Sequence, residues 1–292
     1  MASSNIMEKG AVVITGTSTG IGRACALSLD KIGLQVFAGV RKKEDGEVLK
    51  QESSERLTPI IIDVTDNDSI ARASEIVRES IGEGGLAGLV NNAGTAVVMG
   101  PLEFIPIDKF MKQVYVNLIG HIAVIQAFLP LLRKHNGRII NIGSIGGIQA
   151  VPFNGPYGAS KAALENLTDS LRMELRPWDI PVTIVIPGNI STAIWKKARE
   201  TAVALLKSLP ENANDLYSSA IDSLVHHISN KMETSGNPPE AVAKVVIKAL
   251  LTKKPKTRYI VGWDARMQII MAKFVFDRVR DRIMLRYLGL AK

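Results

Sequence analysis

The sequence predicts an α/β fold in which a doubly wound parallel sheet of about seven strands carries helices on both faces. Short runs of β-branched residues alternate with longer stretches of helical periodicity, and strands separated by helices require crossover connections. Runs such as Val12-Val13-Ile14 and Ile60-Ile61-Ile62 are apolar at every position, which is typical of strands covered on both faces. We find no internal repeat or low-complexity linker, so residues 1–292 are interpreted as one domain.

The elements follow from these patterns in chain order. The predicted strands are short apolar runs: Ala11–Thr15, Gln35–Val40, Pro59–Ile62, Leu86–Asn91, Arg138–Ile142, Val182–Ile186 and Arg258–Val261. The predicted helices between them repeat apolar residues every three or four positions: Ile21–Ile32, Ser69–Ile81, Ile107–Arg133, Tyr157–Arg176 and Pro239–Leu251. Two regions depart from the alternation. Residues 192–237 form a mostly helical insertion that ends in a Ser-Gly-Asn-Pro-Pro breaker cluster, and residues 264–292 form a basic amphipathic tail.

Composition restricts the classes of function. The chain is 46% hydrophobic and 22% charged, which is typical of a globular protein with a full core. Its net charge is +8, but it has no long basic block and only 5% aromatic residues, so nucleic-acid binding is disfavoured. The first ten residues contain no apolar signal segment, and no run of about 18 uncharged apolar residues predicts a transmembrane helix.

Cysteine and histidine usage argues against disulfides and metals. The single cysteine, Cys25, lies on the apolar pattern of the first helix, and it fits a reducing, cytoplasmic compartment. The four histidines show no metal-ligand spacing with acids or cysteines, so we predict no metal site and interpret them as packing or surface residues.

A glycine-rich turn, Thr15-Gly16-Thr17-Ser18-Thr19-Gly20-Ile21-Gly22, joins the first strand to the first helix. Glycines allow a tight turn and a close approach of the backbone to a pyrophosphate, and the N–H groups of the following helix face the negative charge. The alternative is a turn with only a packing role. Its place between a first strand and a first helix favours nucleotide binding in a Rossmann-like fold.

The second strand ends at Val40-Arg41-Lys42-Lys43, without the acid that would accept hydrogen bonds from the ribose of NAD. Arg41 can pair with a 2′-phosphate, which a carboxylate would repel. We therefore predict NADP, with NAD left open. The alternative for Arg41 to Lys43 is the start of a solvated helix.

Tyr157 and Lys161 are one helical turn apart, so they share a face. A nearby ammonium group favours the phenolate, and we therefore expect the pKa of Tyr157 to be lowered from about 10. Ser144, which follows a strand, could hold the substrate oxygen that Tyr157 protonates. A hydrolase role for Ser144 is rejected because its loop lacks the G-x-S-x-G pattern.

Together these motifs resemble the short-chain dehydrogenase/reductase family. The family's segments occur in order as Thr15–Gly22 (TGxxxGxG), Asn91-Asn92-Ala93-Gly94 (NNAG), Asn117, Ser144, Tyr157-x-x-x-Lys161 and Pro187–Thr192 (PGxxxT). The resemblance implies a catalytic set of Asn117, Ser144, Tyr157 and Lys161, in which Asn117 anchors a water that relays protons through Lys161. It also implies cofactor contacts from Gly16, Ser18, Gly20, Ile21, Asp63, Val64, Asn91, Tyr157, Lys161, Ile190 and Thr192, in addition to Arg41. Thr19 departs from the basic residue that NADP-binding members often carry in the glycine loop.

Two functions from different classes remain. The first is an NADP(H)-dependent oxidoreductase that moves a hydride between the nicotinamide and a carbonyl or alcohol. The alternative is a non-catalytic NADP(H)-binding sensor or scaffold of the same fold. The intact set of Asn117, Ser144, Tyr157 and Lys161 favours the enzyme, because a sensor does not need all four.

Substrate and partners are predicted more coarsely. Trp195 and Tyr217 in the apolar insertion suggest a lid over a hydrophobic substrate, such as a steroid or retinoid, and a hydroxy acid or sugar stays open. The resemblance implies a homodimer or homotetramer that pairs through the helices carrying Asn117 and Tyr157. The tail has three interpretations: subunit contact, core cover, or a helix lying in a membrane surface with basic residues turned outward.

Overall fold

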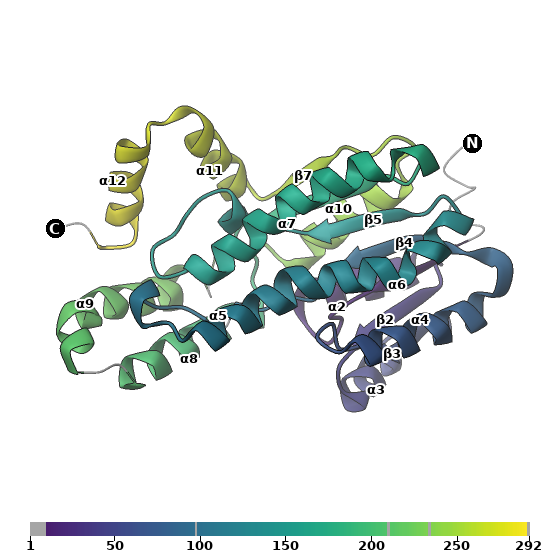
Figure 1. Cartoon of the computed structure of the whole chain (residues 1–292), viewed down its shortest axis with the longest axis horizontal. Coiled ribbons are helices and arrows are strands. Elements are labelled where there is room, and N and C mark those ends of the chain that lie inside the picture. The colour runs from purple at the N-terminus through teal and green to yellow at the C-terminus, as the bar shows by residue number, and fades with distance from the viewer. Residues whose placement is uncertain (1–9, 97, 209–210, 233–234, 291–292) are drawn as a thin grey trace.

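The computed structural model describes residues 10–96, 98–208, 211–232 and 235–290. Its sheet has seven parallel strands in the order β3-β2-β1-β4-β5-β6-β7, so the winding direction reverses between β1 and β4 (Figure 1). The predicted doubly wound parallel sheet is confirmed. The strands are β1 Ala11–Ile14, β2 Val36–Val40, β3 Leu57–Ile61, β4 Leu86–Asn91, β5 Arg138–Ile142, β6 Val182–Pro187 and β7 Arg258–Val261.

Helices cover both faces of the sheet. One layer contains α2 Gly20–Lys31, α3 Lys43–Gln51 and α10 Pro239–Leu251, and the other contains α4 Asn67–Ile81, α6 Gly120–Lys134 and α7 Gly155–Glu174. Alternate residues of β1 serve the two layers, because Val12 belongs to the core with α2 and α10 while Val13 belongs to the core with α4 and α6. This double cover explains why β1 is apolar and buried at every position.

The predicted helix Ile107–Arg133 has an interruption. α5 Ile107–Val114 and α6 are joined by a π-helical turn, Tyr115–Ile119. By length and composition Ile107–Lys134 could cross a membrane, a test that core helices also pass, and 39% of its apolar window is buried. Because α6 packs against β4 and α4, we interpret it as a core helix.

Three regions add detail that the sequence-based expectation lacked. α3 was not predicted, because its segment is strongly charged and buries only Gly46 and Leu49. The insertion forms α8 Ala193–Ser208, α9 Glu211–His227 and a π-helical turn Ile228–Met232, with residues 209–210 and 233–234 outside the described part. The tail, predicted to be helical at about 264–292, forms two helices, since extended backbone at Val275 and Phe276 separates α11 Trp263–Phe274 from α12 Asp277–Tyr287.

Short turns complete the chain. They are the 3-10 helices Gly82–Gly84, Leu102–Phe104, Ile145–Gly147 and Arg176–Trp178. Residues 1–9 and 291–292, the ends of the predicted domain and tail, lie outside the described residues. In Figure 1, α8, α9, α11 and α12 lie at one end of the molecule, beyond the sheet.

Candidate active site

The glycine loop lies at the carboxyl end of β1, where the winding of the sheet reverses. Gly16 and Gly20 have φ values of 69° and 58°, a region that side chains with a Cβ rarely adopt. A Cβ at Gly22 would lie 2.2 Å from the Gly16 carbonyl oxygen, so the first turn of α2 packs directly on the loop. Asn92, which sequence reasoning did not single out, donates from Nδ2 to Thr15 O (2.9 Å) and Gly16 O (3.0 Å). Asn92 therefore ties the glycine loop to the end of β4.

The loop of the predicted PGxxxT motif faces the glycine loop. A Cβ at Gly20 would lie 3.1 Å from Thr192 Cγ2, so these two predicted contacts are brought together. The backbone N–H of Ser191 donates to Asn237 O (2.9 Å), and Asn237 N–H donates to Asn189 O (2.8 Å). Ile190 is buried between them. The 187–192 loop is thus paired to the segment that precedes α10.

Arg41 is exposed at the end of β2, one residue before the N-cap of α3. Lys43 pairs with Glu47 on the surface of that helix, so the solvated-helix alternative is confirmed for Lys43 but not for Arg41. Burial raises the pKa of Asp63, but two hydrogen bonds from Thr65 and the charges of Arg41 and Lys112 outweigh it and lower the pKa overall. Arg41 and Asp63 therefore lie within electrostatic reach of each other.

Ser144, Tyr157 and Lys161 meet at the carboxyl end of β5. Ser144 accepts the backbone N–H of Gly146 (3.1 Å), and the ring of Tyr157 and the hydroxyl of Ser144 both border Gly146. Pro156 at the start of α7 is tolerated because the first helical positions need no N–H donor, and Tyr157 follows it directly. One turn later, Lys161 Nζ donates to the carbonyl oxygen of Ile142 (2.8 Å).

Burial sets the protonation of this pair. It raises the pKa of Tyr157, and the Ser144 hydrogen bond lowers that pKa only in part. The expectation of a lowered pKa is therefore wrong for the chain alone, because desolvation of the phenolate outweighs its hydrogen bond. Burial also lowers the pKa of Lys161 to about 8. At neutral pH the site holds a neutral phenol beside a lysine that is mostly protonated.

Asn117 lies within the π-helical turn and is fully buried. Its Oδ1 accepts the N–H of Thr95 (2.8 Å), while Nδ2 donates to Thr95 O (2.9 Å) and to Ser160 Oγ (3.0 Å). Ser160 in turn donates to Tyr157 O (2.7 Å). The extra residue of the π turn thus turns Asn117 toward the start of α7. Through Ser160, Asn117 stabilises the first turn of the helix that carries Tyr157.

Asn91 lies at the end of β4 with its side chain fully buried. It donates from Nδ2 to Asn141 Oδ1 (3.1 Å), and Asn141 donates to Thr168 Oγ1 on α7 (2.9 Å). The Nδ2 group of Asn91 is thus used inside the sheet, and the cofactor contact expected of this residue stays a prediction. Asn91 therefore contributes by tying β4, β5 and α7 together.

His121 is a site neighbour that sequence reasoning assigned to packing or the surface. It is fully buried, and its Nε2 lies 2.7 Å from Ala93 O of the NNAG segment. Burial and the charge of Lys161 lower its pKa to about 3. The sequence signal that could have placed His121 near the site is its position one helical turn after Asn117. Among the described residues we find no metal-binding cluster of histidine, cysteine and acidic side chains.

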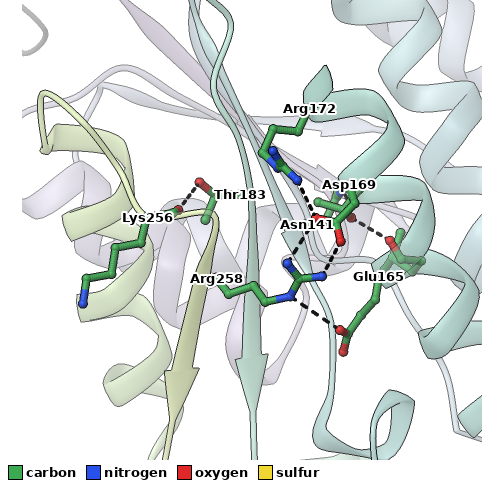
Figure 2. A network of polar contacts seen from close by, with 9 residues as sticks. Asn141, Glu165, Asp169, Arg172, Thr183, Lys256 and Arg258 are labelled. Atoms are coloured by element: carbon green, nitrogen blue, oxygen red, sulfur yellow. Dashed lines mark hydrogen bonds and ion pairs between the residues drawn. The ribbon is translucent and has the colours of Figure 1, made fainter. Parts of the chain in front are cut away.

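A polar network fixes α7 beyond the site. Figure 2 shows Arg258 of β7 reaching Asp169 and Glu165 of α7, with Arg172 on the other side of Asp169. Burial raises the pKa of Glu165, although Arg258 opposes the shift. Glu165 follows Lys161 by one turn, so the network holds the helix in register behind the reacting groups.

Comparison with known proteins decides the family. The model of short chain dehydrogenases matches residues 10–203. The chain belongs to the short-chain dehydrogenase family. This dehydrogenase is therefore an oxidoreductase, as the names of its relatives also indicate.

The relatives share almost the whole chain. A 17-beta-hydroxysteroid dehydrogenase type 6 from Bos taurus is 36% identical, over 94% of this chain and 87% of the relative. An NADPH-dependent 3-dehydrocapnine reductase from Ornithobacterium rhinotracheale is 35% identical, over 93% and 94% of the two chains. A solved short-chain dehydrogenase from Streptomyces avermitilis is similar with a TM-score of 0.76, 26% identity and 97% of each chain covered. The predicted family resemblance is confirmed.

Proposed function

We propose that this dehydrogenase uses NADP(H) to interconvert a carbonyl group and a primary or secondary alcohol of a hydrophobic substrate. One observation carries the proposal. Tyr157 and Ser144 lie side by side around Gly146, with Lys161 one turn further along the same helix face, at the carboxyl end of β5. This arrangement offers a proton and a hydrogen bond to one oxygen atom, as the reduction of a carbonyl requires.

The residues present fit a dinucleotide. The glycine loop and the start of α2 offer backbone N–H groups with no Cβ in the way, and Thr192 lies opposite Gly20. We assign Gly16, Ser18, Gly20 and Ile21 to the pyrophosphate and adenosine ribose, Asp63 and Val64 to the adenine, and Ile190 and Thr192 to the carboxamide. The cofactor, when bound, supplies or accepts the hydride.

The protein's own residues handle the proton. The neutral phenol of Tyr157 donates a proton to the carbonyl oxygen, which the Ser144 hydroxyl holds in place. Lys161 then stabilises the phenolate by its charge, and an N–H not used by Ile142 O would be available to hydrogen-bond the nicotinamide ribose. Both amide N–H groups of Asn117 are engaged, so we propose that Asn117 supports the proton path by holding Thr95 and α7 in place.

NADP is favoured over NAD by the charge at the end of β2. Arg41 is exposed there, and the three residues that follow the strand are all basic. A relative with 35% identity is named as an NADPH-dependent reductase, which supports the same choice.

A hydrophobic substrate is favoured by the insertion, which we propose to act as a lid. Trp195 of α8 belongs to a small apolar cluster with Met99 and Leu224, and its Nε1 donates to Ile190 O (3.1 Å). The ring of Tyr217 lies edge-on to Phe104 and Phe153, with centroids 6.0 and 6.1 Å apart. Relatives named as hydroxysteroid and retinol dehydrogenases agree with an apolar substrate.

The experiment is NADPH oxidation, followed by absorbance, with hydrophobic ketones and aldehydes, steroid ketones and retinal among them. Short hydroxy acids and sugars, assayed in the reverse direction with NADP, are the comparison. We expect turnover with the apolar carbonyls. Tight NADPH binding without turnover on any compound would contradict the proposal and favour the sensor alternative.

We also propose that two copies pair through α6 and α7. A groove of about 440 Å³ runs between these helices, and its apolar walls include Ile122, Leu129, Leu167 and Leu171. Trp178 at its end is 48% exposed and carries Arg133 at 4.7 Å over its ring. An apolar groove of this kind is typical of a surface that a second subunit covers.

For the tail we propose contact with an anionic membrane surface by a protein that is otherwise cytoplasmic. α11 and α12 expose large apolar side chains: Trp263, Met267, Ile270, Phe274, Phe276, Val279, Ile283 and Tyr287. Exposed cations are interspersed with them: Arg266, Lys273, Arg278, Arg282 and Arg286. Apolar rings combined with cations suit the boundary between headgroups and acyl chains.

A further inference from the structure

Asp264, in the first turn of α11, reaches a loop that lies 75 residues earlier in the chain. Its Oδ2 accepts the backbone N–H of Asn189 at 2.6 Å. A hydrogen bond to an ionised acceptor is shorter and stronger than a neutral one. The carboxylate thus fixes the peptide directly before Ile190, inside the 187–192 loop.

Two glycines make room for this carboxylate. A Cβ at Gly188 would lie 2.1 Å from Asp264 Oδ2, and a Cβ at Gly262 would lie 2.3 Å from Oδ1. Gly262 also has a φ of 101°, which other residues rarely adopt. Each of the two backbone segments around the carboxylate therefore has a glycine at a position where any side chain would displace the carboxylate. The backbone at both Gly188 and Gly262 thus leaves space for the Asp264 carboxylate.

A simpler role for Asp264 is an acid that favours the N-terminus of α11 through the helix dipole. That role needs a carboxylate near the helix end, but not one aimed at another loop. It also does not explain why Oδ1 is buried with no hydrogen-bond partner among the described residues, which is unfavourable for a carboxylate. The geometry fits a carboxylate held for its contact with Asn189.

We propose that Asp264 is the positioning residue of the nicotinamide end of the site. By fixing the Asn189 peptide it sets the place of Ile190 and Thr192, which hold the carboxamide in the proposed function on which this inference rests. Because α11 also packs against residues 145–147, directly after Ser144, the first C-terminal helix borders the active site on two sides. The helix α11 is then part of the active-site structure.

Hydrogen exchange of the intact protein without cofactor tests the contact directly. In Asp264→Ala, peptides covering residues 187–192 should exchange about tenfold faster than in the wild type, and Asp264→Asn, which keeps an acceptor oxygen, should lie between them. Asp277→Ala, which removes an exposed acid of α12 that pairs with Arg280, is the matched control and should leave the loop unchanged. Unchanged loop exchange in Asp264→Ala would overturn the proposal whether or not the protein binds NADPH.

Binding measurements separate positioning from general damage. Asp264→Ala should lower the affinity for NADPH about tenfold. The affinity for 2′,5′-ADP, which lacks the nicotinamide half, should stay within about twofold of the wild-type value. Equal weakening of both ligands, or of neither, would count against a role at the nicotinamide end. If the wild type bound neither ligand, the proposed function would fail, and the exchange experiment would still decide the contact.

The glycine pair gives an independent check. In the wild-type background, Gly188→Ala should weaken NADPH binding, because the added Cβ clashes with the Asp264 carboxylate. In the Asp264→Ala background this clash is absent, so the fold-loss of NADPH affinity should be at least about threefold smaller. Equal losses in both backgrounds would show that Gly188 does not serve Asp264.

Discussion

At the scale of single residues, burial sets the chemistry of the site more than neighbouring charges do. Tyr157 keeps its proton because desolvation outweighs the Ser144 hydrogen bond, whereas Lys161 has its pKa lowered to about 8 by the same cause. The sequence indicated the neighbours of Tyr157 but not how deeply they are buried, so it gave the wrong direction for this pKa. A neutral phenol suits the donation of a proton to a carbonyl oxygen.

We propose that Arg41 carries the preference for NADP. Replacing it with alanine removes a charge that can pair with a 2′-phosphate. Arg41→Ala should therefore lower the affinity for NADPH by about tenfold and the affinity for NADH by less than twofold. Fluorescence titration of the two cofactors measures the difference. Lys43→Ala is the control, since Lys43 pairs with Glu47 on α3. Equal losses for NADPH and NADH would remove Arg41 from the cofactor site.

His121 gives a dependence of stability on pH. The pKa of His121 is about 3 in the folded chain and about 6.5 in the unfolded chain. When the pH falls below 6.5, the unfolded state therefore binds a proton at this residue while the folded state stays neutral there. The free energy of unfolding should therefore fall by roughly 3 kcal/mol more in the wild type than in His121→Asn between pH 6.5 and 4.

Urea unfolding at each pH measures this difference. His226→Asn, at an exposed position, is the control for loss of an imidazole. Parallel pH curves for the wild type and His121→Asn would show that His121 is charged or solvated in the folded chain.

At the scale of elements, the sequence predicts strands better than interruptions of helices. The strands carry their own signal in β-branched residues, and four of the seven are displaced by only one or two residues at an end while the other three match. The π turn at Tyr115–Ile119 and the break at Val275 have no such signal. The π turn is stabilised by Asn117 contacts with distant segments, and the break is marked only by the extended backbone of Val275. The π turn is also what turns Asn117 toward α7.

The pair of helices α6 and α7 leads to a prediction about assembly. Leu167→Glu places a charge in their apolar groove, so it should convert a dimer to monomers in light scattering without unfolding the chain. Ile76→Glu on the exposed face of α4 is the matched control and should leave the mass unchanged. A monomeric wild type, or a dimer that tolerates Leu167→Glu, would place any subunit contact elsewhere.

At the scale of the whole molecule, the fold gathers the proposed chemistry at one end. The glycine loop, Ser144 and the 187–192 loop all follow strand ends, as expected for a sheet of this winding, and α8, α9, α11 and α12 lie beyond that end (Figure 1). Sequence motifs could locate these loops because each motif is contiguous. They could not locate the contact of Asp264 with Asn189, which joins distant segments.

The tail should bind vesicles in proportion to their negative charge. Phe274→Ser combined with Phe276→Ser removes two rings that are 79% and 86% exposed, so cosedimentation with vesicles rich in phosphatidylserine should fall at least about tenfold. Leu216→Ser, at an exposed site on α9, is the control. Equal binding to neutral phosphatidylcholine vesicles, or no effect of the double substitution, would contradict a membrane role for the tail.

The central claim is that Tyr157 transfers the proton in an NADP(H)-dependent reaction, and Tyr157→Phe tests it most directly. The variant removes one oxygen atom and leaves the glycine loop, Arg41 and Lys161 in place. Turnover with the best hydrophobic carbonyl and NADPH affinity should be measured on the same preparation. We expect turnover to fall by about a thousandfold or more, while the NADPH dissociation constant changes by less than about threefold. A variant that keeps a substantial part of the wild-type rate would contradict the account.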